Sequence, residues 1–314
     1  MRSPGSLLSF LAATALLLTA CGSERASSAD AGVGPTGRPS TTRVDDPGKD
    51  GVRITSLTLP TASPSPSPSP TRRTSVSADS LRLDGDSGIS ATFDVTNSGA
   101  KTLTYSINFT FMSSDGGAMS GQSATVRDVG PGKTVRGTVR AGKLPPSTPR
   151  ITRVKVLDVT KVPAGEAPAQ PGTCPASGIR VSADKGDAAM GLRIVGLHLD
   201  NCGTRDYTVD GYPQLELLDD DFGPVDGIRI LHGSGGITAG AGPDEQPRRV
   251  LLKPGESARA SLVWRNTTEA GTAVDVPYVR VRAKTGADPV TVTPHLDLGT
   301  TGKLGVRPWV KANG

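Results

Sequence analysis

Apolar and polar residues alternate along several short stretches of this chain, and this alternation limits the fold more than any other feature. In the longest stretch, 103–111, Leu, Tyr, Ile, Phe and Phe occupy every second position, and Thr, Ser, Asn and Thr stand between them. A period of two residues places successive side chains on opposite faces of an extended strand. We therefore predict half-buried β-strands, separated by glycine-rich turns such as 97–99, 115–117 and 129–132.

The alternating stretches fall into two units, 76–162 and 174–314, joined by a Pro/Ala/Gly connector at 163–173. In the first unit we expect strands at 89–95, 103–111, 133–141 and 151–159. In the second unit we expect strands at 179–183, 192–200, 207–209, 215–218, 228–231, 250–252, 258–264, 278–283 and 290–292. Short strands between regular turns predict an all-β protein with two antiparallel, immunoglobulin-like β-sandwich domains.

Local patterns within the strands and turns make this prediction more specific. Ala258, Ala260, Leu262 and Trp264 form one face of a strand and are expected to point inward. The apolar alternation changes phase around Gly196, which predicts a β-bulge. Each unit also has a proline followed by a glycine just before a strand, at 130–133 and 253–256. Proline and glycine at the two central positions fit a type II turn.

The segment before the first unit has few large apolar residues. Residues 21–75 are rich in Ser, Thr, Gly, Asp, Arg and Pro, and 63–70 repeat the dipeptide Ser-Pro. Such a composition cannot offset the entropy of ordering, and Ser-Pro repeats favour an extended polyproline II spacer. We predict that 21–75 is a disordered tether. Residues 52–59 alternate weakly, but we assign them to the tether as well.

The chain begins with Arg2 and an apolar run, Leu7–Leu18, that ends in Leu18-Thr19-Ala20-Cys21. The run is shorter than the roughly 20 residues that a membrane-spanning helix needs. Leu-x-Ala-Cys after an apolar run matches a bacterial lipoprotein signal, cut before Cys21, whose thiol then carries a diacylglycerol. We predict that residues 1–20 are a signal peptide and that Cys21 anchors the protein to membrane lipid. The alternative is an ordinary signal peptide with a cysteine near its cleavage site.

Assigning Cys21 to lipid leaves one possible cysteine pair, Cys174 and Cys202. In an oxidising compartment such a pair is normally a disulfide. Closing a loop of roughly 30 residues would constrain the unfolded chain by about 3 to 4 kcal/mol. Two buried free thiols are the alternative, and the distance between the cysteines decides between the two.

Both units resemble known families. Leu199–Thr204, Gly211–Leu215, Leu252–Ala258 and the closing 298–309 are similar, in this order, to the actinobacterial domain of unknown function 4232. This resemblance covers 174–312, implies a secreted or lipid-anchored β-sandwich, and brings no known catalytic residues. The first unit resembles the FxLYD type of β-sandwich module in bacterial surface lipoproteins, through Phe93–Gly99, 115–117 and 129–133.

The sequence contains no motif that supports catalysis. Residues 130–134 end like a phosphate-binding loop, but Arg127 stands where the first glycine belongs and the segment joins two strands. No Gly-x-Ser-x-Gly elbow is present. We predict no enzymatic activity and no cofactor.

The sequence gives only a weak basis for a metal site. His198, His232 and His295 are far apart, and His198 is expected to face solvent. A site that combines a histidine with 219–221 is an alternative, but a solvated hairpin end is the simpler interpretation of this acidic run. We therefore predict no metal.

Charge and aromatic residues suggest possible partners. The formal charge of +5 falls to +4 once Arg2 leaves with the signal, and the basic residues are scattered, which argues against nucleic acid. Tyr212, Trp264 and Trp309 could form an aromatic sugar-binding surface, or belong to the core. We expect a non-enzymatic binding or scaffolding module on the outer face of the bacterial cytoplasmic membrane. The alternatives are a binder of cell-wall carbohydrate or anionic polymer, a partner of an envelope protein, or an envelope hydrolase.

Overall fold

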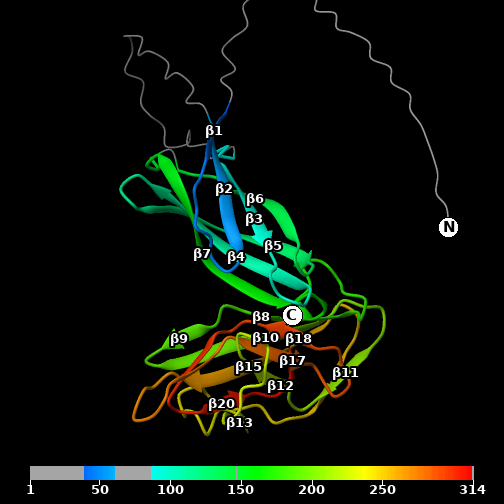
Figure 1. Cartoon of the computed structure of the whole chain (residues 1–314). Coiled ribbons are helices and arrows are strands. Elements are labelled where there is room, and N and C mark those ends of the chain that lie inside the picture. Colours follow the sequence, from blue (N-terminus) through cyan, green and yellow to red (C-terminus); the bar gives the residue numbers. More distant parts are fainter. Residues whose placement is uncertain (1–38, 61–85, 146, 313–314) are drawn as a thin grey trace, which may run out of the picture. The chain divides into compact units, whose positions relative to one another are not determined.

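A computed structural model describes residues 39–60, 86–145 and 147–312 (Figure 1). These residues belong to one compact unit, 38–314, and form two β-sandwiches with separate buried cores. The predicted all-β class with antiparallel sheets is confirmed. The predicted signal peptide, Cys21 and the Ser-Pro repeat lie outside the described residues. Within the described ranges, no helix has the length and apolar character needed to cross a membrane.

The first sandwich packs a four-stranded sheet against a three-stranded sheet. The four strands, in spatial order, are β1 (Ser40–Arg43), β2 (Val52–Leu59), β3 (Ser90–Thr96) and β6 (Thr134–Arg140). The three strands are β5 (Ala118–Val129), β4 (Leu103–Ser113) and β7 (Ile151–Pro163). Phe93 and Phe109 meet between the sheets, with ring centroids 4.8 Å apart. The four strands expected in this unit are confirmed.

The predicted start of the first unit at residue 76 is wrong. Strand β2 pairs with β3 along its length, and Val52, Ile54 and Leu57 are buried in the first core. The short strand β1 then pairs with β2. The register of β2 against β3 shifts between Ile54 and Ser56, so the buried positions change from a spacing of two to a spacing of three. This irregularity weakened the alternation in the sequence and explains why 52–59 was assigned to the tether.

The second sandwich is built from more strands. One sheet has the order β13 (Arg229–His232), β20 (Lys303–Val306), β15 (Ser257–Arg265), β10 (Leu192–Asn201) and β8 (Ile179–Ala183), with β9 (Asp187–Ala189) and β21 (Val310–Lys311) paired at its margins. Facing elements are β12 (Gln214–Leu218), β17 (Tyr278–Arg282) and β18 (Val290–Val292), and the pair β11 (Tyr207–Asp210) and β14 (Arg249–Leu252). A further short pair joins β16 (Val274–Val276) and β19 (Leu296–Gly299).

All nine strands expected in the second unit are present, within one residue at each end. The inward face of β15 is also confirmed, because Ala258, Ala260, Leu262 and Trp264 are buried. The short strands β9, β16, β19, β20 and β21 were not expected, since two to four residues are too few to show a period.

The bulge predicted at Gly196 is absent from β10, whose register against β15 runs unbroken from Leu192 to Asp200. The irregularity lies instead in the segment that joins β8 to β9, both of which pair with β10. There, the Asp184 carboxylate accepts hydrogen bonds from the backbone amides of Gly186 and Gly196. A Cβ atom at Gly196 would lie against that carboxylate. This glycine is therefore explained by the packing of Asp184.

Both proline–glycine turns have the predicted form. Lys133 N donates to Gly130 O, and Glu256 N donates to Lys253 O, which closes each four-residue turn. The glycines at the third position, Gly132 and Gly255, have φ of 66° and 85°, as a type II turn requires. The segment that resembles a phosphate-binding loop is therefore a turn between β5 and β6.

The predicted connector is held against the second sandwich. After β7 a single 3₁₀ turn, η2 (Ala164–Glu166), begins the connector. The Glu166 carboxylate accepts hydrogen bonds from Arg280 Nε at 2.8 Å and from Thr291 Oγ1 at 2.6 Å. On the other side, Arg127 of β5 donates to the carbonyl of Pro168. The connector thus has fixed contacts with strands of both sandwiches.

Candidate functional site

The aromatic surface considered in the sequence analysis does not form. Trp309 and Trp264 are 0% and 2% exposed, and both belong to the second core. Their indole nitrogens have internal partners, since Trp309 donates to the Ala283 carbonyl and Trp264 to the Asp297 carboxylate. Tyr212 alone is partly accessible, and it stacks on His232. The hypothesis of an aromatic sugar platform is therefore wrong, because packing of the large side chains in a chain poor in aromatics builds the core instead.

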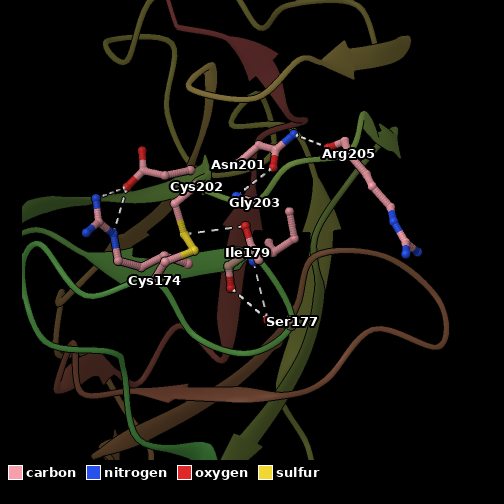
Figure 2. Close-up of a disulfide and its surroundings, with 10 residues drawn as sticks. Cys174, Ser177, Ile179, Asn201, Cys202, Gly203 and Arg205 are labelled. Atoms are coloured by element: carbon pink, nitrogen blue, oxygen red, sulfur yellow. Dashed lines mark hydrogen bonds and ion pairs between the residues drawn. A yellow bond between two sulfur atoms is a disulfide. The ribbon is translucent and has the colours of Figure 1, made fainter.

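The predicted disulfide between Cys174 and Cys202 is confirmed, with a Cα–Cα distance of 5.7 Å. Both cysteines are exposed at the surface, which excludes the alternative of two buried thiols. Figure 2 shows that the bond joins the start of the second domain to the turn that follows β10. Next to it the two backbones meet directly, because Gly203 N donates to Gly178 O at 2.9 Å. The disulfide therefore closes a corner of the second sandwich.

The residue before Cys202 organises this corner. The Asn201 side chain, 1% exposed, donates to the carbonyls of Arg205 and Leu252 and accepts a hydrogen bond from Gly203 N. Its backbone amide donates to Glu256 O, and its carbonyl accepts from Gly255 N. One asparagine thus connects the turn after β10 with the proline–glycine turn before β15.

The first sandwich has the same corner. The Asn97 side chain donates to the carbonyls of Lys101 and Val129 and accepts from Gly99 N. Its backbone amide donates to Lys133 O, and its carbonyl accepts from Gly132 N. All five hydrogen bonds correspond to those of Asn201, with equal spacing within each turn. In this corner Ser98 stands where the second sandwich has Cys202.

Two hollows adjoin the disulfide corner of the second sandwich. One, of about 530 Å³, is lined by Cys174, Asn201 and 203–207. The other, of about 540 Å³, is lined by connector residues, by 283, 284 and 286–290, and by Arg127 of the first sandwich. Both share the wall formed by 175–177, Ile179 and Tyr207. The disulfide fixes Cys174 at one end of this wall, so it holds the boundary between the hollows in place.

Basic side chains line the hollow beside the connector, which we call the basic hollow. They are Arg127, Arg180 and Lys284, and one carboxylate, Asp288, accompanies them. Arg180 is already paired, since its guanidinium lies 2.7 Å from the Asp200 carboxylate. Because one of its three cations is neutralised in this way, two positive charges face one negative charge.

The Lys284 ammonium group lies over the aromatic ring of Tyr207. Lys284 Nζ lies 4.1 Å from the centroid of the Tyr207 ring and donates to the Thr208 carbonyl. Burial raises the pKa of the Tyr207 hydroxyl, and the negative charge of Asp288 raises it further. The tyrosine therefore stays neutral at physiological pH and offers a hydroxyl group and an aromatic face.

Arg127 reaches the hollow from β5. Its Nη2 atom donates to Pro168 O at 2.8 Å, which orients the guanidinium. Its Nε atom is buried and has no hydrogen-bond partner among the residues that the structure describes. A buried donor without a partner is costly, and an anion entering the hollow could offset that cost.

The histidines and the acidic run show no arrangement for a metal. Within 39–60, 86–145 and 147–312, no group of three or more His, Cys, Asp or Glu side chains is placed to hold an ion. His198 faces solvent, as predicted, and lies 3.3 Å from the Asp184 carboxylate. The run 219–221 is exposed, and Asp219 accepts hydrogen bonds from the amides of Asp221 and Gly223. It is the hairpin end that we expected.

Fold and site together define a protein of two β-sandwiches, in which the second has a disulfide-bonded corner and an adjoining basic hollow. Residues 174–310 match the model of a family described as a domain of unknown function (DUF4232). The match begins at Cys174, where we expected the second unit to begin, and it supports the resemblance found in the sequence. No curated protein matches the chain.

Reasoning from the sequence found the disulfide but not the basic hollow. Arg127, Tyr207 and Lys284 belong to segments that are far apart in the chain, and nothing in their local sequence distinguishes them from other surface residues. The repeated Asn-x-Gly and Pro-Gly elements could have revealed the shared corner. They were interpreted only as separate turns.

Proposed function

We propose that this protein is a lipid-anchored, non-enzymatic binding or scaffolding module on the outer face of the bacterial cytoplasmic membrane. The observation that carries the anchor is the run that ends in Leu18-Thr19-Ala20-Cys21. In this proposal the signal peptide, 1–20, is removed and Cys21 is bound to membrane lipid. The chain that follows places both sandwiches outside the membrane.

The oxidised pair Cys174–Cys202 supports the proposed compartment. Disulfides persist in secreted and surface proteins, whereas the cytosol keeps thiols reduced. This bond is exposed on the surface of the second sandwich, so a reducing compartment would have access to it. An extracytoplasmic location accounts for both observations together.

Binding of anionic polymer is the more specific candidate function. It is favoured by the basic hollow, in which the Lys284 ammonium and the Arg127 guanidinium line the same cavity of about 540 Å³. A cavity of this size is typical of ligand sites. We further propose that the first sandwich is a module of the FxLYD type and that the protein is actinobacterial, on the motifs described above.

Replacement of the anchoring cysteine tests the proposal. Cys21→Ala should move the protein from the membrane fraction to the soluble fraction and abolish incorporation of labelled palmitate. Ser27→Ala, a few residues beyond the proposed cleavage site, is the matched control and should remain lipid-labelled and membrane-bound. Retention of the Cys21→Ala protein in the membrane, or continued labelling, would refute the anchor.

A further inference from the structure

Two cations at the basic hollow have no acidic partner. Within the described residues, neither Lys284 Nζ nor the Arg127 guanidinium has a carboxylate oxygen within 4.0 Å. Both side chains are nevertheless held in place, Lys284 by the Thr208 carbonyl and the Tyr207 ring, and Arg127 by the Pro168 carbonyl. Fixed cations lose little conformational entropy when they bind an anion, and charge-assisted contacts are strong.

Lys284 also connects the basic hollow with a second cavity. It lines a neighbouring hollow of about 360 Å³ together with Arg249, Tyr212 and Gln214. Arg249 is exposed and, in the part of the chain that the structure covers, forms no ion pair. Arg127, Lys284 and Arg249 therefore follow one another across two adjoining hollows. We call this arrangement the basic track.

The basic track also has groups that suit hydroxyl-bearing ligands. Asp288 lines the basic hollow and Asp210 the neighbouring one, so each cavity has one exposed carboxylate that can accept hydrogen bonds from hydroxyl groups. Ser177, Gln214 and Thr285 add donors and acceptors. The two carboxylates would repel a simple inorganic anion and could not form hydrogen bonds with it. A sugar that also carries a negative group uses both kinds of contact.

We propose that the basic track binds a strand of acidic glycan, with its carboxylate or phosphodiester groups at Lys284, Arg127 and Arg249 and its hydroxyl groups at Asp288 and Asp210. This inference rests on the proposed function of an envelope binding module and names its ligand class. A polymer fits better than a single sugar, because Lys284 is shared by two cavities and the outermost cations belong to different ones.

The surroundings of the basic track favour glycan over a lipid surface. Proteins that lie on membranes combine basic residues with large apolar side chains that enter the acyl region. The large apolar side chains that are exposed in the described residues are Val135, Leu157, Met190, Ile230 and Leu251. None of them lines the basic hollow or the neighbouring hollow. The cavity walls are formed mainly by small or polar residues.

Binding of defined polymers to the full mature chain tests the inference. Polygalacturonate supplies carboxylates, poly(glycerol phosphate) supplies phosphodiesters, and neutral dextran of similar length is the control. We expect at least one acidic polymer to bind at low salt, with affinity falling as salt rises. Lys284→Glu should weaken that binding by about tenfold or more, because it reverses the charge shared by both hollows. Arg127→Gln and Arg249→Gln should each weaken it less.

Further variants separate the basic track from general charge and from misfolding. Lys155→Glu on β7 makes the same charge change at an exposed residue that lines neither hollow, and it should leave affinity almost unchanged. Lys284→Met keeps the aliphatic stem over Tyr207 and should also lose affinity, while its melting temperature stays near that of the wild type.

The inference is overturned if neither acidic polymer binds, if Lys155→Glu weakens binding as much as Lys284→Glu, or if dextran binds equally well. Tighter Lys284-dependent binding of soluble dihexanoyl phosphatidylglycerol would assign the basic track to a lipid headgroup and also refute the glycan. These measurements do not depend on lipid at Cys21. Failure of the anchor and failure of the glycan site can therefore be told apart.

Discussion

The two sandwiches have the same framework around their corners and differ in what stabilises it. In both, an asparagine at the end of a central strand makes five equivalent hydrogen bonds to two turns. Asn97 directly follows β3, and Asn201 is the last residue of β10. The central strand pairs in the same way with its neighbours, β2 and β6 in the first sandwich and β8 and β15 in the second. A buried amide can therefore define a corner in two different sequence contexts.

The differences between the two sandwiches lie around this common corner. The first sandwich has the long uninterrupted strand β4, whereas the second divides the corresponding path between β11 and β12. The second sandwich adds the disulfide at Cys202, where the first has Ser98. A divided strand has fewer continuous ladder hydrogen bonds, and the covalent bond constrains the unfolded chain instead. The comparison suggests that the disulfide compensates for the shorter strands.

Removing the disulfide should produce the largest difference in stability between the two sandwiches. Replacing Cys174 and Cys202 together with serine is expected to destabilise the second sandwich by about 3 to 4 kcal/mol, from the loss of a constraint on the unfolded chain. Hydrogen exchange followed by mass spectrometry would measure protection separately in each sandwich. Peptides of the first sandwich should show unchanged exchange. Equal loss of protection in both would mean that the two sandwiches unfold as one unit.

Replacing the corner asparagines should have the next largest effect. Asn97→Ala and Asn201→Ala each leave one buried carbonyl, of Val129 or Leu252, and one part-buried carbonyl without a side-chain donor, so each should destabilise its own sandwich by roughly 1 to 3 kcal/mol. Urea denaturation, with the affected sandwich identified by hydrogen exchange, would measure both. The exposed Asn108→Ala in β4 is the control and should change little. If only one of the two variants lost much unfolding free energy, the equivalent hydrogen bonds would not contribute equally to stability in the two sandwiches.

The smallest expected effect concerns pH. Burial raises the pKa of Asp200, but hydrogen bonds from Ser257 and Arg180 outweigh it and hold the pKa below its ordinary value. Because the folded-state pKa lies below the unfolded value of about 3.9, the charged carboxylate stabilises the second sandwich above that pH. This contribution is lost as the pH falls through the folded-state pKa. Asp200→Asn should therefore differ from the wild type in unfolding free energy at pH 7, and the difference should shrink on acidification.

The equivalent position in the first sandwich supplies the control for this pH dependence. Thr96 corresponds to Asp200, and its hydroxyl forms a 2.9 Å hydrogen bond with Thr134, where the second sandwich has Ser257. Neither threonine titrates, so Thr96→Val should change stability by an amount that does not depend on pH. A difference for Asp200→Asn that stayed constant between pH 7 and pH 3 would contradict the assigned role of the carboxylate.

The sequence predicted the strands well where they alternate regularly and are long enough to show a period. It failed at β2, where an irregular register after Ile54 disturbs the alternation, and at β5, whose edge position allows many polar residues. The apolar phase change near Gly196 does not correspond to a change of buried face in β10, where Val195, Leu197 and Leu199 are all buried. The irregularity lies in the paired segment that contains Asp184. A single-strand pattern does not show which of two paired strands is irregular.

The candidate site could be predicted only in part. The disulfide followed from a count of cysteines once Cys21 was assigned to lipid. The basic track forms only when the fold brings distant segments together. No local sequence pattern shows that Arg127 lies near the segment that contains Lys284. The tryptophans were ambiguous for a related reason, since an aromatic residue on an alternating strand can serve a core or a ligand surface.

The contact between Gly178 and Gly203 restricts how this corner can evolve. A Cβ atom built on either glycine would lie 3.0 Å from the other's Cα. Even one methyl group would therefore push the two backbone segments apart next to the disulfide. Gly178 also has a φ of 74°, which disfavours any other residue. Substitution of either glycine is therefore disfavoured by the presence of the other, whereas the exposed neighbours Thr204 and Arg205 can be substituted.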